Sequence, residues 1–83
     1  MIEAVIYGDP TLCTKLAKRL VCGVRDLPLR LRLNTVTDTQ AAIEAGATHD
    51  PSLFINGKLF IGGLVASETM TQAMQQYLLK ESQ

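Results

Sequence analysis

The spacing of apolar and polar positions changes several times along the chain, and each spacing predicts one kind of element. Short runs of β-branched, aliphatic and aromatic residues predict strands at Ile2–Tyr7, Ser52–Ile55 and Leu59–Ile61. Alternation of leucine with polar residues or proline predicts a further strand over Leu27–Asn34. Because proline cannot donate to a strand ladder, we expect this strand at an edge of the sheet.

Three stretches show the three- and four-residue spacing of amphipathic helices. The first runs from about Pro10 to Cys22, with Asp9 as its N-cap, Pro10 in its first turn and Gly23 as its stop. On this helix Cys13 falls on the apolar face, whereas Cys22 falls on the polar face. We therefore expect a buried Cys13 and an exposed Cys22.

The two other helices carry capping signals of their own. In Thr37-Asp38-Thr39-Gln40 the pattern of a capping box makes Thr37 the N-cap, and the helix ends at Gly46. The last helix begins with Ser67 as its cap and packs on the sheet. Its apolar stripe consists of Met70, Ala73, Met74, Tyr77 and Leu78.

A β-hairpin is the clearest local feature of the chain. Asn56-Gly57 supplies the two positive-φ positions of a type I′ turn between the strands at 52–55 and 59–61. Pro51 precedes the first of these strands, so its missing N–H falls where the ladder has not begun. The same proline pushes Asp50 toward extended geometry.

The predicted order is β-α-β-α-β-β-α. The first crossover should be parallel and right-handed, and an antiparallel hairpin follows it. We therefore predict an α/β fold, a four-stranded mixed sheet with helices on both faces. Its 83 residues (1–83) form a single domain.

Composition excludes some classes of partner. Eight basic residues balance eight acidic ones, so the chain offers no electrostatic reason to bind nucleic acid or an anionic membrane. Arg25, Arg30 and Arg32 form only a small basic patch. The opening residues MIEAVIYG are too short for a signal peptide or a membrane span, which makes a cytoplasmic location the expectation.

The element order and two motifs resemble the thioredoxin-like superfamily, in particular the glutaredoxins and the small glutaredoxin-like thioredoxins. One motif runs from Gly46 through Pro51 to Lys58, and the other is Ile61-Gly62-Gly63. The resemblance covers the whole chain and implies a cis peptide bond before Pro51. It also implies a binding groove made by Asp9, Pro10, Thr11, His49, Asp50, Pro51, Gly62 and Gly63.

Activity in this superfamily rests on a Cys-x-x-Cys motif, where this chain has Pro10-Thr11-Leu12-Cys13. The attacking thiol is therefore absent, and Pro10 offers no nucleophile in its place. Cys22 cannot replace it, because nine helical residues rise by roughly 13 Å, whereas bridgeable Cα atoms lie within about 7 Å.

Cys13 occupies the position of the second, resolving thiol, and it is the one candidate catalytic residue. It could form a mixed disulfide or be oxidised, or it could be a buried structural residue. Asp9 opposes a thiolate at the same helix end. His49 could pair with Cys13 or be a solvated loop histidine, and one His with two separated Cys does not predict a metal site.

No cofactor is predicted, and glutathione is the one candidate that the resemblance offers. Leu64-Val65-Ala66-Ser67 departs from the acidic segment with which glutaredoxins hold glutathione, and Gly8-Asp9 lacks the basic residue often found before their cysteines. The main-chain groups of Asp50 could instead pair with an extended peptide.

Three hypotheses follow, in this order. The first is a redox-weak or inactive module that binds a peptide or protein. The second is a one-cysteine thiol-disulfide exchange enzyme that uses Cys13. The third is an assembly role in which the edge of the leucine-rich strand pairs with a second copy, so that the chain is a monomer or a weak homodimer.

Overall fold

Strand β1 (Ile2–Tyr7) lies inside a four-stranded sheet in the computed structural model, which describes residues 1–81. It pairs in parallel with β2 (Leu31–Val36) and antiparallel with β3 (Ser52–Ile55). Strand β4 (Lys58–Gly62) pairs antiparallel with β3, which gives the order β2-β1-β3-β4. The predicted element order and the mixed four-stranded sheet are confirmed.

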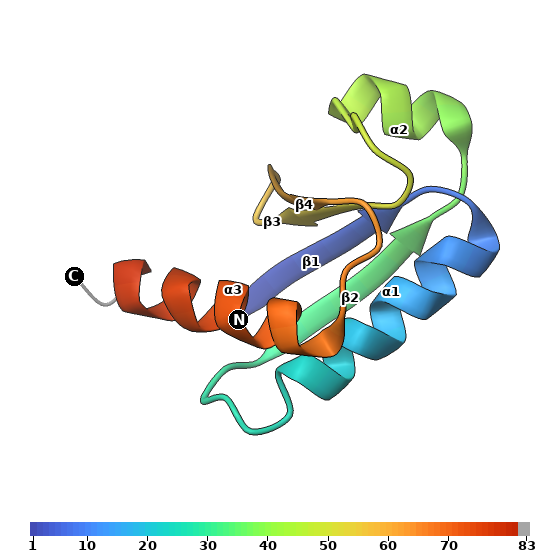
Figure 1. Cartoon of the computed structure of the whole chain (residues 1–83). Coiled ribbons are helices and arrows are strands. Elements are labelled where there is room, and N and C mark those ends of the chain that lie inside the picture. Colours follow the sequence, from blue (N-terminus) through green and yellow to red (C-terminus); the bar gives the residue numbers. More distant parts are fainter. Residues whose placement is uncertain (82–83) are drawn as a thin grey trace.

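Helices α1 (Pro10–Gly23) and α3 (Ser67–Glu81) lie on one side of this sheet, and α2 (Thr39–Ala45) lies on the other, beyond the end of β1 (Figure 1). Alternate residues of β1, such as Ala4 and Ile6, point to the side of α1 and α3 and are fully buried. The core contains Ala4, Ile6, Cys13, Leu16, Leu20, Leu53, Ile55, Met70 and Met74.

Helix α1 begins as the sequence predicts. The Asp9 carboxylate accepts hydrogen bonds from the main-chain N–H groups of Thr11 and Leu12, at 3.0 and 3.3 Å. Pro10 occupies the first turn, where a helix has no intrahelical use for an N–H. The first turn is therefore satisfied without any contribution from another segment.

The expectation that Gly23 stops α1 is wrong. Gly23 is the last residue of the helix and is buried, and Val24 is the C-cap. A Cβ atom at Gly23 would lie 2.8 Å from the Ser67 carbonyl oxygen and 3.2 Å from Met70 Cβ. The glycine is needed for the close approach of α1 to α3. A hydrogen bond from Thr71 Oγ1 to the Gly23 carbonyl, at 2.6 Å, stabilises this approach.

Ser67 is likewise the first residue of α3 and not its N-cap. The helical bonding starts one residue earlier than predicted, because Met70 N–H donates to the Ala66 carbonyl at 3.1 Å. The predicted apolar stripe is confirmed, since Met70 and Met74 are fully buried and Tyr77 packs against the core.

Strand β2 covers residues 31–36 and not the predicted 27–34. Residues 27–30 have no neighbouring strand, because β1 begins at Ile2, which is paired with Leu31. They follow a turn that the hydrogen bond from Leu27 N–H to the Val24 carbonyl closes, and they have an irregular backbone. Leu27 and Leu29 still pack against the core, which explains why the alternation extends beyond the strand. The edge position of β2 is confirmed.

Helix α2 has Asp38, and not Thr37, as its N-cap. The Asp38 carboxylate accepts a hydrogen bond from Gln40 N–H at 3.2 Å, so the helix starts one residue later than the capping box indicates. Gly46 ends the helix in the left-handed conformation, as predicted. No residue of α2 is buried.

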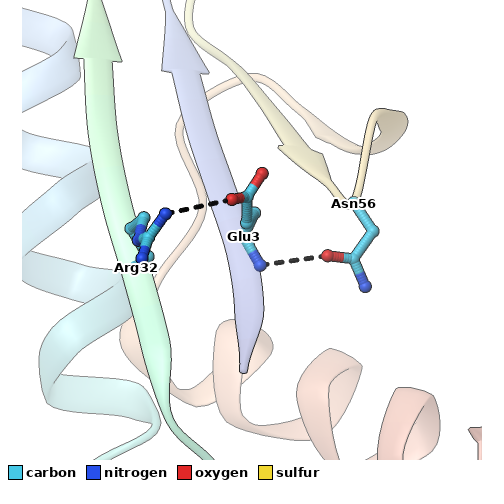
Figure 2. Close-up of polar contacts among 3 residues, drawn as sticks. All are labelled: Glu3, Arg32 and Asn56. Atoms are coloured by element: carbon cyan, nitrogen blue, oxygen red, sulfur yellow. Dashed lines mark hydrogen bonds and ion pairs between the residues drawn. The ribbon is translucent and has the colours of Figure 1, made fainter.

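The hairpin between β3 and β4 has the predicted turn. Asn56 and Gly57 have φ values of 48° and 84°, which a type I′ turn requires. The Asn56 side chain also accepts a hydrogen bond from Glu3 N–H at 3.0 Å and thereby ties the turn to β1 (Figure 2). On its other side Glu3 forms a 3.4 Å ion pair with Arg32, but both side chains are 62% exposed, so the pair contributes little stability.

We predict that Gly23→Ala destabilises the protein. Alanine is the better helix former by about 1 kcal/mol, but its Cβ would press on α3, and overpacking typically costs about 1–3 kcal/mol. We expect the free energy of unfolding in urea to fall by about 1–2 kcal/mol. Cys22→Ala, at an exposed neighbouring position, serves as the control and should leave it nearly unchanged. A Gly23→Ala protein more stable than the parent would contradict the close helix contact.

Candidate functional site

A groove of about 510 Å³ lies between the start of α1, helix α2 and the loop that leads into β3. We refer to it as the α2 groove. It is lined by Tyr7, Gly8, Asp9, Pro10, Thr37, Asp38, Thr39, Ala42, Ile43, Ala47, Thr48, His49 and Asp50.

The structure brings together half of the predicted groove residues. Asp9, Pro10, His49 and Asp50 line the α2 groove, whereas Thr11, Pro51, Gly62 and Gly63 do not. Pro51 is buried next to the lining residue Asp50, and the peptide bond from Asp50 to Pro51 is cis, as expected. Cys13 is not among the lining residues.

A hydrogen bond between two segments far apart in the sequence fixes the wall of the groove opposite α2. Asp9 N–H donates to Asp50 Oδ1 at 2.8 Å, across 41 residues of sequence. Gly8 makes this approach possible: a Cβ atom there would collide with Asp50 Oδ1 and lie 3.1 Å from Pro51 Cα. Its φ of 149° also favours glycine.

The amino terminus of α1 is occupied by a carboxylate of the chain itself. Asp9 Oδ2 accepts from two main-chain N–H groups of the first turn, Thr11 and Leu12. Helix N-termini stabilise negative charge through such N–H groups. Because a carboxylate already occupies them, this helix end offers little stabilisation to a second anion.

Cys13 is held as a protonated thiol. Its side chain is 1% exposed, and Sγ donates to the Ile6 carbonyl oxygen at 3.7 Å. Burial raises the pKa of the thiol, and the negative charges of Asp50 and Asp9 raise it further. Since the thiolate is the reactive species, neither access nor ionisation favours chemistry at Cys13. Both cysteines are free, and Cys22 is exposed as predicted.

His49 faces Gly62 and not Cys13. Its Nδ1 lies 2.9 Å from Thr48 Oγ1, and a Cβ atom at Gly62 would lie 2.6 Å from its ring atom Cγ. The Ser52 hydroxyl holds the His49 main chain by accepting from its N–H at 3.1 Å and donating to its carbonyl at 2.6 Å. Within residues 1–81 no hydrogen bond joins His49 to Cys13, so the Cys–His alternative has no support.

Asp50 presents unpaired main-chain groups beside the groove. In the part of the chain that the structure describes, neither its N–H nor its carbonyl has a hydrogen-bond partner. The next carbonyl, that of Pro51, accepts from Gly63 N–H at 2.7 Å and is therefore occupied. One donor and one acceptor of Asp50, which lies in a bend before β3, thus remain open, like the main-chain groups at the edge of a sheet.

Sequence reasoning missed the wall of the groove that α2 and the segment before it provide. Thr37, Asp38 and Ile43 line this wall, and Ile43 is 64% exposed. The available signal was weak: Ile43 is a large apolar residue in a helix too short to bury it. Where a seven-residue helix lies relative to the sheet depends on tertiary contacts that local patterns do not show.

No protein-family model matches the chain, and no curated protein matches it. Residues 1–81 include no group of three or more His, Cys, Asp or Glu side chains arranged to hold a metal ion. None of their helices has the length and apolar character that crossing a bilayer requires.

The raised pKa of Cys13 predicts how stability depends on pH. The unfolded chain releases the thiol proton near pH 8.5, whereas the folded protein releases it at a higher pH. The stability that the buried thiol contributes is therefore fully present below the unfolded pKa and is lost as the pH rises toward the folded pKa. From pH 7 to pH 10, the free energy of unfolding should therefore fall more in the parent than in Cys13→Ala.

Urea titrations at the two pH values measure this difference. Cys22→Ala, which keeps the buried thiol, should follow the parent. Burial raises the pKa of Tyr77 as well, with Glu81 adding to the effect, but this residue is common to all three proteins and cancels in the comparison. Parallel pH profiles for the parent and Cys13→Ala would contradict the assignment.

Proposed function

We propose that this chain is a thioredoxin-like module of the glutaredoxin type that lacks the attacking cysteine and binds an extended segment of a peptide or protein. The α/β order and the mixed sheet are compatible with such a fold. The sequence resemblance around Pro51 and Gly62-Gly63 supports the finer assignment. Recognition without thiol chemistry is the function that the geometry of the groove supports best.

The open main-chain groups of Asp50 carry this proposal. An extended peptide gains affinity by pairing its own N–H and carbonyl groups with those of an exposed edge. Asp50 offers one such donor and one such acceptor at the mouth of a groove of about 510 Å³. The groove is large enough to receive a side chain of the bound segment next to that pairing.

Within residues 1–81 no cysteine lines the groove, which supports binding rather than exchange. Pro10 lines the groove but carries no reactive group, and Cys13 is buried with a raised pKa. A one-cysteine exchange enzyme would need Cys13 to meet a disulfide sulfur in line, which a 1% exposed side chain does not allow. No contact in the described part of the chain favours this alternative.

Peptide titration followed by NMR tests the proposal. We expect a mixture of end-blocked hexapeptides with randomised side chains to shift the amide signals of Gly8, Asp9, Thr48, His49 and Asp50. Pro10→Trp places a bulky side chain in the groove and should abolish these shifts. Gln75→Trp adds the same bulk to the exposed surface of α3 and should leave them intact.

Two results would overturn the proposal. One is a set of groove signals that does not move at millimolar peptide in a folded protein. The other is equal loss of the shifts in both tryptophan variants, because the effect would then not depend on the groove.

Mass spectrometry after incubation with oxidised glutathione separates binding from exchange. We expect a single adduct, formed on the exposed Cys22 at the rate of an unstructured thiol and absent from Cys22→Ser. Cys13→Ser should behave like the parent, because the buried thiol does not react. A Cys13-dependent adduct that forms faster than that of an unstructured thiol would establish the exchange enzyme instead.

A further inference from the structure

We propose that the segment bound in the α2 groove is basic, and that one of its lysine or arginine side chains enters the groove and pairs with the carboxylates of Asp9, Asp38 and Asp50. This inference rests on the proposed function and adds the chemistry of the partner. It concerns which side chains the groove selects, whereas the main-chain pairing at Asp50 does not depend on the sequence of the bound segment.

The groove is acidic although the chain as a whole is not. Asp9, Asp38 and Asp50 line it, and no lysine or arginine of residues 1–81 does. The formal net charge of the whole chain is zero, so this excess of negative charge is local. The ion pair that the described chain forms, Arg32 with Glu3, involves neither the groove nor its carboxylates.

Each of the three carboxylates is fixed in place yet keeps one free oxygen. Asp9 Oδ2 accepts from Thr11 and Leu12, Asp38 Oδ1 accepts from Gln40, and Asp50 Oδ1 accepts from Asp9. In every case the donor is a main-chain N–H, so the side chain's position follows that of the backbone. The second oxygen of each carboxylate has no partner within residues 1–81. Acceptors held in this way lose little conformational entropy when a cation binds.

The remaining lining of the groove suits the stem of a long basic side chain. Ala42, Ile43 and Ala47 provide an apolar wall beside the carboxylates, and Ile43 is 64% exposed. Lysine and arginine bury their methylene groups along such surfaces and keep the charged end near polar groups. The exposed isoleucine and the neighbouring carboxylates therefore fit the two ends of one such side chain.

The same charges disfavour an acidic segment. Burial is the main cause of the raised pKa of the Cys13 thiol, and the negative charges of Asp50 and Asp9 raise it further. A glutamate or aspartate entering the groove would meet these negative charges directly, and no lysine or arginine of residues 1–81 lines the groove to pair with it. The groove therefore selects by repulsion as well as by attraction.

Three end-blocked peptides of equal length test the selectivity: Ala-Arg-Ala-Arg-Ala, Ala-Gln-Ala-Gln-Ala and Ala-Glu-Ala-Glu-Ala. Alternate residues of an extended peptide share one side, so either both charged side chains or neither face the groove. We expect the arginine peptide to bind with the lowest Kd and the glutamate peptide with the highest. The Kd values come from titrations of the Asp9 and Asp50 amide signals.

Asparagine variants test which charges are responsible. Asp38→Asn and Asp50→Asn keep an oxygen that accepts the same main-chain hydrogen bond but remove the charge. Each should weaken binding of the arginine peptide by roughly twofold to fivefold and weaken binding of the glutamine peptide less, so that the preference for arginine falls. Asp26→Asn, an exposed aspartate outside the groove, removes the same charge and should change neither Kd.

The outcomes separate this inference from the proposed function. If all three peptides shift the groove signals with equal Kd values, the module binds peptides but the inference is wrong. If the arginine peptide binds preferentially but Asp26→Asn weakens it as much as Asp38→Asn and Asp50→Asn do, overall charge and not the groove is responsible, and the inference also fails. If none of the peptides shifts the groove signals in the folded parent, both the inference and the proposed function are overturned.

Discussion

The hydrogen bond from Asp9 N–H to Asp50 Oδ1 is the constraint on which the candidate site depends. It joins the turn after β1 to the loop before β3, 41 residues later, at 2.8 Å. Without a side chain at Gly8 the two segments approach closely enough to form it. This contact places one carboxylate at the start of α1 and another beside Pro51, and it leaves the main-chain groups of Asp50 open. Two of the three carboxylates of the groove are placed by it, and their charges add to the effect of burial, which is the main cause of the raised pKa of Cys13.

Local signals in the sequence predicted the features that a few neighbouring residues determine. Asn56-Gly57 produced the expected turn, and Asp9 with Pro10 produced the expected helix start. The errors lie where a distant segment decides the outcome. Gly23 looked like a helix stop, but it is glycine because α3 packs on it. The alternating leucines from Leu27 onward looked like a strand, but pairing starts only where β1 supplies a neighbour.

The candidate site was predictable to a similar extent. The burial of Cys13 and the effect of Asp9 on its ionisation followed from helical spacing and from the charge at the helix end, and both are confirmed. The wall formed by Asp38 and Ile43 was not foreseen, because no sequence pattern states which end of the sheet a short helix lies against. His49 faces Gly62 because of the packing of the loop on β4, which a single histidine in a sequence does not show.

Helix α2 gives the groove two walls of unequal stiffness. Its residues are all at least partly exposed, so little burial holds this helix to the rest of the protein, and its local opening should cost less free energy than that of the core. The opposite wall, at Asp9 and Asp50, is fixed by main-chain hydrogen bonds and by the buried Pro51. The width of the groove can therefore adjust by movement of one wall while the charges of the other keep their positions, which would let one site accommodate side chains of different lengths.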